Sequence, residues 1–184
     1  MRKQLFSNSG GLSTQLEKIM SNLNELNLTE LMTRATTDVF STMVSMELES
    51  SNTPCEESTN GEKKIVGSVG FAGAIKGVVY LHLHEGLAGI ITETMLGLEA
   101  SELGEDEIND VVGELSNMIG GNVKSRLCDA GFSCQLSVPS VARGNQFDIR
   151  PMAVNGERIE DCVFQNDGDQ IRLVVALKNG ETEA

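Results

Sequence analysis

The stretch Glu105–Gly131 reads EDEINDVVGELSNMIGGNVKSRLCDAG and predicts a long amphipathic helix. At about 100° of rotation per residue, one side of this helix collects apolar side chains. These are Ile108, Val111, Val112, Leu115, Met118, Ile119 and Val123. A helix that buries this side must present its other side to solvent or to a partner.

The opposite side of the helix carries Asp110, Glu114, Asn117 and Gly121, which we call the polar stripe. An acid and an amide one turn apart, beside a glycine that opens the surface, could together position a water molecule. Exposed helix faces often carry Asp, Glu and Asn, so the spacing Glu-x-x-Asn alone is also typical of a solvated face. The stripe has no Lys or Arg at the i+4 positions that would make it a ladder of ion pairs.

Three glycines inside the same helix, Gly113, Gly120 and Gly121, favour a more specific interpretation. Each costs roughly 0.5–1 kcal/mol relative to Ala in a helix interior. Such glycines usually permit close approach of another backbone or helix. Tight internal packing would explain Gly113 and Gly120, and a partner lying against the stripe would explain Gly121.

The rest of the chain predicts an α+β domain with an antiparallel-rich sheet and long helices packed on one face. Helices are expected at Leu28–Leu48, with Thr29 as N-cap, at Glu85–Leu96 and at Glu105–Gly131. Strands are expected at Lys64–Ala72, Gly77–His84, Cys134–Ala142, Asp161–Gln165 and Gln170–Leu177, with a surface loop at Ser50–Glu62. In this interpretation residues 1–27 form an N-terminal extension, residues 28–178 the domain, and residues 179–184 a flexible tail.

The charge of the chain restricts the classes of ligand. Its 27 acidic against 14 basic residues give a formal net charge of −13. Nucleic acids and anionic membranes attract basic surfaces, so neither is an expected partner. The N-terminus resembles no signal peptide, and no apolar run approaches the ~18 residues of a membrane span, so we expect a cytoplasmic protein.

Other candidate sites are weaker. His82 and His84 lie on one face of a predicted strand, a geometry that metals can use, but spacing identifies no third ligand. A half-exposed strand face or a subunit contact is the favoured interpretation of the pair. No nucleophile–base arrangement and no phosphate-binding glycine loop follow from local sequence.

The run Asp110-x3-Glu114-x2-Asn117, followed by Pro139, resembles the signature of the CheC/CheX family of chemotaxis phosphatases. Two flanking stretches also resemble the family: GSVGFAGAIKGVVYLHL before the helix and LSVPSVARG after it. The resemblance covers about Leu28 to Leu177 and is closer to the CheX branch. It implies a phosphatase acting on the aspartyl phosphate of a CheY-like response regulator receiver domain.

The resemblance also implies roles for individual residues. Asn117 would position the attacking water, and Glu114 would pair with a lysine of the receiver domain. Asp110 and Gly121 would contact the partner, with Asp110 either capping the contact or merely solvated. The required Mg²⁺ would sit in the receiver domain, so no intrinsic cofactor or metal site is expected, and family members suggest a homodimer.

The chain departs from the two-site relatives at its first helix, where TRATTDVFSTMVSMELE carries Asp38, Thr42 and Ser45 but no Glu-x-x-Asn. We therefore expect one active surface per chain. The alternative function is a non-catalytic adaptor that binds a receiver domain or a flagellar-switch component through the same fold.

Overall fold

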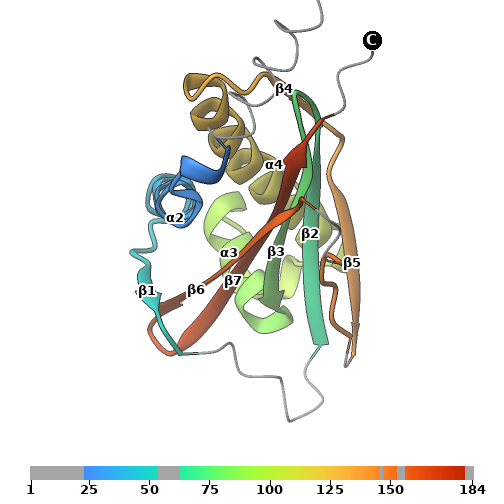
Figure 1. Ribbon diagram of the computed structural model, residues 1–184. Coiled ribbons are helices and arrows are strands. Elements are labelled where there is room, and N and C mark those ends of the chain that lie inside the picture. The colour runs from blue at the N-terminus through green and yellow to red at the C-terminus, as the bar shows by residue number, and fades with distance from the viewer. Residues whose placement is uncertain (1–22, 54–62, 146, 153–155, 181–184) are drawn as a thin grey trace, which may run out of the picture.

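The computed structural model describes residues 23–53, 63–145, 147–152 and 156–180 (Figure 1). In this part of the chain, a seven-stranded antiparallel sheet with strand order β1-β6-β7-β3-β2-β4, and with β5 also paired to β2, carries its α-helices on one face. The strands are β1 (Glu49–Ser51), β2 (Lys63–Gly73), β3 (Ile75–His84), β4 (Cys134–Leu136), β5 (Ser140–Asn145), β6 (Arg158–Asn166) and β7 (Asp169–Asn179). The helices are α2 (Leu28–Val39), α3 (Glu85–Leu96) and α4 (Glu105–Asp129). The predicted fold class is confirmed.

The central strands alternate as the sequence predicts, because period-2 patterning sends every second side chain to the helix-covered face. Val69 of β2 pairs with Val79 of β3, and both side chains are buried. Gly73 has a φ of 144° at the turn between these strands, a conformation that favours glycine. The hairpin therefore turns more tightly than predicted, and both strands are longer.

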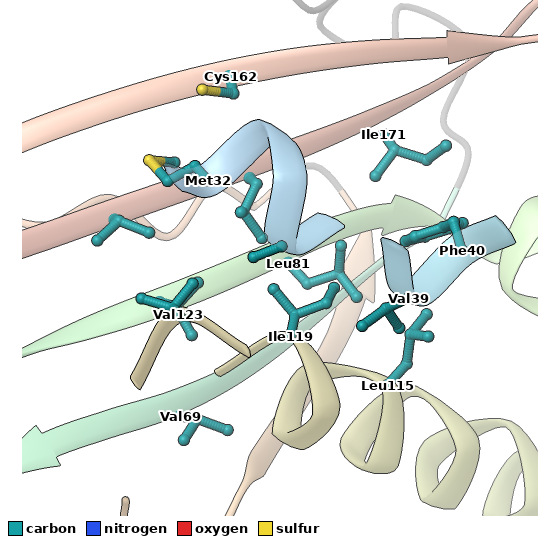
Figure 2. Packing of buried hydrophobic residues seen from close by; sticks show 14 of the residues in the cluster. Met32, Val39, Phe40, Val69, Leu81, Leu115, Ile119, Val123, Cys162 and Ile171 are labelled. Carbon is teal, nitrogen blue, oxygen red and sulfur yellow. The ribbon is translucent and has the colours of Figure 1, made fainter. Parts of the chain in front are cut away.

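The core fills the space between the sheet and the helices (Figure 2). Helical contributions come from Met32, Val39, Phe40, Leu115, Ile119 and Val123, and the sheet contributes Val69, Leu81, Cys162 and Ile171. All seven apolar positions predicted for α4 are buried or partly buried. Burial of these apolar side chains fixes which side of α4 faces outward.

Helix α4 approaches β2 unusually closely. A Cβ atom placed on Gly67 would lie 2.0 Å from Ser116 Oγ and 3.1 Å from Val112 Cγ1. One turn further on, a Cβ on Gly120 would lie 3.3 Å from Val69 Cγ1. Two glycines, one on each element, thus allow α4 to lie directly on the sheet.

The first helix differs from its predicted bounds at both ends. Asn27, and not Thr29, caps α2, because the Asn27 side chain accepts a hydrogen bond from Glu30 N. The α-helix gives way to a π-helical turn at Phe40–Val44, and Ser45 ends it in the left-handed conformation with φ 58°. The prediction that the helix continues to Leu48 is therefore wrong.

Two features of the sheet were not predicted. Glu49–Ser51 forms the short edge strand β1 on β6, partly within the segment predicted as a surface loop. The single strand predicted at Cys134–Ala142 is divided into β4 and β5, both paired with β2. Pairing partners that lie more than a hundred residues away decide the first feature, and local hydrophobic patterning carries no such information.

Residues 23–27, within the predicted N-terminal extension, contact the body of the domain. Leu23 is buried, and Arg158 of β6 donates hydrogen bonds to the carbonyl oxygens of Leu23 and Leu26, the latter at 2.9 Å. The predicted extension otherwise lies outside the described residues, as do residues 181–184 of the predicted tail.

We expect Gly67→Ala to lower the free energy of unfolding by about 1–3 kcal/mol, the usual cost of overpacking a core. The added methyl group would collide with Ser116, whose hydroxyl is buried and bonded to Val112 O at 2.7 Å. Urea denaturation measures the change. Gly89→Ala is the control, because a Cβ there meets no atom within 4 Å.

The double variant Gly67→Ala/Ser116→Ala should recover part of the loss, because it removes the colliding hydroxyl oxygen. Strictly additive effects of the two substitutions would contradict the contact.

Candidate functional site

The structure places the polar stripe on the outward side of α4. Asp110 and Glu114 are exposed, Asn117 is half-buried, and a Cβ on Gly121 would meet no atom within 4 Å. From Asp110 to Gly121 the stripe extends over about three turns, or about 16 Å of helix. The stripe is therefore an open, elongated surface and not a pocket.

The ends of α4 are fixed locally. Glu107 accepts a hydrogen bond from the backbone N–H of Gly104 at 3.0 Å, which satisfies one free donor at the N-terminus. At the C-terminus, Phe132 N donates to Leu127 O at 2.8 Å and Gly131 adopts a φ of 93°. This is the Schellman arrangement, in which a left-handed glycine satisfies the last carbonyls.

The acidic N-terminus of α4 is tied to neighbouring elements. Glu105 Oε1 lies 3.2 Å from Arg143 Nη1 of β5 and 3.7 Å from Lys63 Nζ of β2. Arg143 also lies 3.4 Å from Glu85 Oε1, at the start of α3. The Arg143 side chain is only 11% exposed, whereas Glu105 is 69% exposed, so solvent screens this pair and the cluster links the starts of both helices to the sheet edge without contributing much stability.

The polar side chains of the polar stripe make no internal polar contacts with the described part of the chain. Among the described residues, the side chains of Asp110, Glu114 and Asn117 have no hydrogen-bond or ion-pair partner. A carboxylate or amide that makes no internal contact contributes little to the stability of the fold. Their side chains are available to a partner.

The three glycines of α4 have different surroundings. Gly120 packs tightly on Val69, as predicted, and Gly121 faces open space. At Gly113 a Cβ would lie 3.6 Å from Val141 Cγ2 and 3.9 Å from Pro139 Cγ, which is ordinary van der Waals contact. The tight packing predicted for Gly113 is therefore wrong, since a methyl group would fit.

A β-bulge borders the stripe. Between β4 and β5, Ser137, Val138 and Pro139 lie opposite only two residues of β2, Val69 and Gly70. Ser137 N donates to Gly70 O and its Oγ accepts from Gly70 N, both at 2.9 Å. Pro139, which has no N–H, suits a position without a ladder hydrogen bond. A proline inside a predicted strand was the signal for this edge bulge, which our strand prediction passed over.

The first helix carries no comparable stripe. Asp38 Oδ2 lies 2.6 Å from Arg126 Nη2 of α4. The Thr42 hydroxyl donates to the Asp38 carbonyl at 2.6 Å. Both side chains thus serve the fold, although Met43, at 42% exposure, reaches the surface beside them.

The two histidines have separate environments. His84 caps α3 by accepting from Leu87 N at 3.4 Å, and its Nε2 lies 3.1 Å from Asp169 Oδ1. Burial, followed by the nearby Arg172, lowers the pKa of His82 to about 4, so this imidazole is neutral at pH 7. The part of the chain that the structure describes contains no group of three or more His, Cys, Asp or Glu side chains suited to a metal ion.

The family model for the chemotaxis phosphatase CheX matches residues 65–159, just over half of the 184-residue chain. The chain belongs to this family. The matched range includes all but the first two residues of the hairpin β2–β3, the helices α3 and α4, and the bulge. The resemblance seen in the sequence is thereby confirmed, and every residue of the polar stripe lies inside the CheX match.

Solved structures agree with the CheX family. The chain is 27% identical to the chemotaxis protein CheX from Vibrio vulnificus, with a TM-score of 0.69, over 83% of this chain and 97% of that one. It is 24% identical to CheX from Desulfovibrio desulfuricans, with a TM-score of 0.68, over 83% and 100% of the two chains.

A third match is the CheX–CheY–BeF3–Mg²⁺ complex from Borrelia burgdorferi, at 21% identity and a TM-score of 0.63, over 82% of this chain and 97% of that one. A comparison of the sequence with curated proteins found no match. None of the described helices is both long enough and apolar enough to cross a membrane.

We expect Gly121→Ala to raise the free energy of unfolding by about 0.5–1 kcal/mol, because the methyl group enters open space and alanine favours the helix. Gly120→Ala should raise the free energy of unfolding by less, because its methyl group must displace Val69 by a few tenths of an ångström. Thermal and urea unfolding of the two adjacent variants compare the effects directly. An equal gain at both positions would contradict the packing described for Gly120.

Proposed function

We propose that this protein removes the phosphoryl group from the aspartyl phosphate of a CheY-like receiver domain. The observation that carries the proposal is the pair Glu114 and Asn117, uncommitted and outward on α4 in a chain of the CheX family. The open shape of the stripe suits a substrate that is itself a folded domain. A small substrate would instead need a concave site that buries most of its surface.

The reaction requires positioning more than covalent catalysis. Water attacks phosphorus, the bond between phosphorus and the aspartyl oxygen breaks, and inorganic phosphate and a free carboxylate result. The second protein must hold the water in line with the breaking bond. The Asn117 carboxamide can both donate to and accept from a water molecule, and it stays neutral beside a phosphoryl group.

Glu114 lies one turn before Asn117 and has a different task in this proposal. Its carboxylate pairs with the lysine of the receiver active site and sets the register of α4 on the partner. Asp110, one turn further away, extends the contact. Gly121 lets the partner approach the helix backbone, because no side chain stands there.

The metal belongs to the partner in this mechanism. Mg²⁺ in the receiver domain would balance charge on the phosphoryl oxygens, and the present chain would add no cofactor. The Borrelia burgdorferi complex supports a CheY-like partner, because the protein that shares the fold of this chain is bound there to CheY. Homodimerisation through a sheet edge stays a prediction; β1 and β5 pair on only one side among the described strands.

Asn117→Ala should reduce acceleration of receiver dephosphorylation by about 100-fold, the scale for losing one positioned donor in an active site. Phosphate loss from a labelled receiver domain measures this rate. Asn122→Ala is the matched control, because Asn122 lies on the same helix but its side chain donates a hydrogen bond to the backbone carbonyl of Met118. Unchanged acceleration with Asn117→Ala would refute the water-positioning role.

Glu114→Gln should weaken receiver binding by about tenfold, or roughly 1.4 kcal/mol, while leaving the fold intact. The loss reflects a removed charge pair, so the difference from wild type should shrink at high salt. Titration with a receiver carrying beryllofluoride measures the affinity. Asp129→Asn is the control, because it removes an exposed acidic side chain at the far end of α4. Normal binding by Glu114→Gln would disprove the docking role.

The same experiments distinguish the adaptor alternative. If wild-type protein binds the receiver stably but leaves the rate of phosphate loss unchanged, the chain is an adaptor and the proposed activity is wrong.

A further inference from the structure

Val138 is an apolar side chain in an unusual position. It is 84% exposed at the tip of the bulge, and only Met152, at 86%, is comparably exposed among the large hydrophobic residues that the structure describes. Isolated exposed apolar residues are common on protein surfaces. Its location relative to the polar stripe distinguishes Val138 from the others.

Helix α4 and the edge strand run antiparallel, which sets the level of Val138 along the helix. Glu105 contacts Arg143, and Gly113 faces Val141 and Pro139. One further turn of helix, about 6 Å, corresponds to about two residues of strand. That step brings Asn117 level with Val138.

Asn117 also points toward the same side. Gly113 faces the edge strand, and Asn117 lies about 40° further round the helix toward solvent, on the basis of 100° per residue. The amide therefore lies between Glu114 and the bulge. A partner that covers Asn117 therefore lies beside the bulge that carries Val138.

The bulge holds Val138 rigidly. The Ser137 hydroxyl accepts from Gly70 N and donates to Val138 O, each at 2.9 Å. Pro139 fixes the backbone on the other side and packs over Gly113. A side chain presented on such a scaffold loses little conformational entropy on binding, which suits an interface anchor.

We propose that Val138 is the apolar anchor of the surface that docks the phosphorylated receiver domain, beside Asn117. The inference rests on the proposed function. The stripe supplies charged groups through Asp110 and Glu114 but no apolar group, and Val138 is an exposed apolar side chain at the level of Asn117. Its burial against the receiver also excludes bulk water from the neighbourhood of Asn117.

The test compares Val138→Ser, Val138→Ile and Met152→Ser with wild type in steady-state dephosphorylation and in binding to a receiver carrying beryllofluoride. We expect Val138→Ser to raise KM and Kd by about fivefold, or roughly 1 kcal/mol, the loss that separates energetically important interface side chains from the near-neutral majority. Val138→Ile should retain wild-type KM, as should Met152→Ser, which removes an equally exposed apolar group elsewhere. Asn117→Ala should instead lower kcat.

The outcomes separate the two proposals. Wild-type binding and KM for Val138→Ser, in an active enzyme, overturn the anchor and leave the proposed function standing. If wild type binds the receiver without accelerating phosphate loss, the activity fails, while the Kd of Val138→Ser still decides the anchor. A change in self-association by sedimentation, with receiver affinity unchanged, shows that Val138 contacts a second copy and overturns the proposal.

Discussion

The close approach of α4 to β2 is the contact on which the remaining structure depends. Gly67 on the strand leaves room for Ser116, and Gly120 on the helix leaves room for Val69. These contacts fix both the distance and the rotation of the helix, because interiors pack at crystal-like density and tolerate little displacement. The polar stripe faces outward as a direct consequence, whichever partner it later meets.

A site built in this way separates stability from function. The buried side of α4 holds the fold together, whereas the side chains of Asp110, Glu114 and Asn117 make no hydrogen bond or ion pair within the described part of the chain. Gly121 illustrates the division, since alanine would stabilise the free helix but, in the proposed complex, would stand between the helix and the receiver domain. The first helix shows the opposite arrangement, in which Asp38 is committed to Arg126 of α4.

The proposed docking surface combines two neighbouring elements of different kinds. One part is a rigid helix that carries Glu114 and Asn117, and the other is an edge strand whose bulge presents Val138. Rigid supports of this kind reduce the entropic cost of forming a complex. The Arg143 cluster connects the two parts by joining β5 to the start of α4. In the proposed mechanism, such connections help to hold Asn117 in the position that orients the water molecule.

Local pattern determined the strands of the hairpin, helix α3 and the two sides of α4, because helical and strand periodicities are set by the chain itself. The resemblance to the family motif indicated Glu114 and Asn117 as candidate functional residues. Tertiary structure alone decided the end of the first helix, the edge strand β1, and the tight packing at Gly120 but not at Gly113. It also brought Val138 level with Asn117. Each of these depends on contacts between residues far apart in sequence, which no local periodicity encodes.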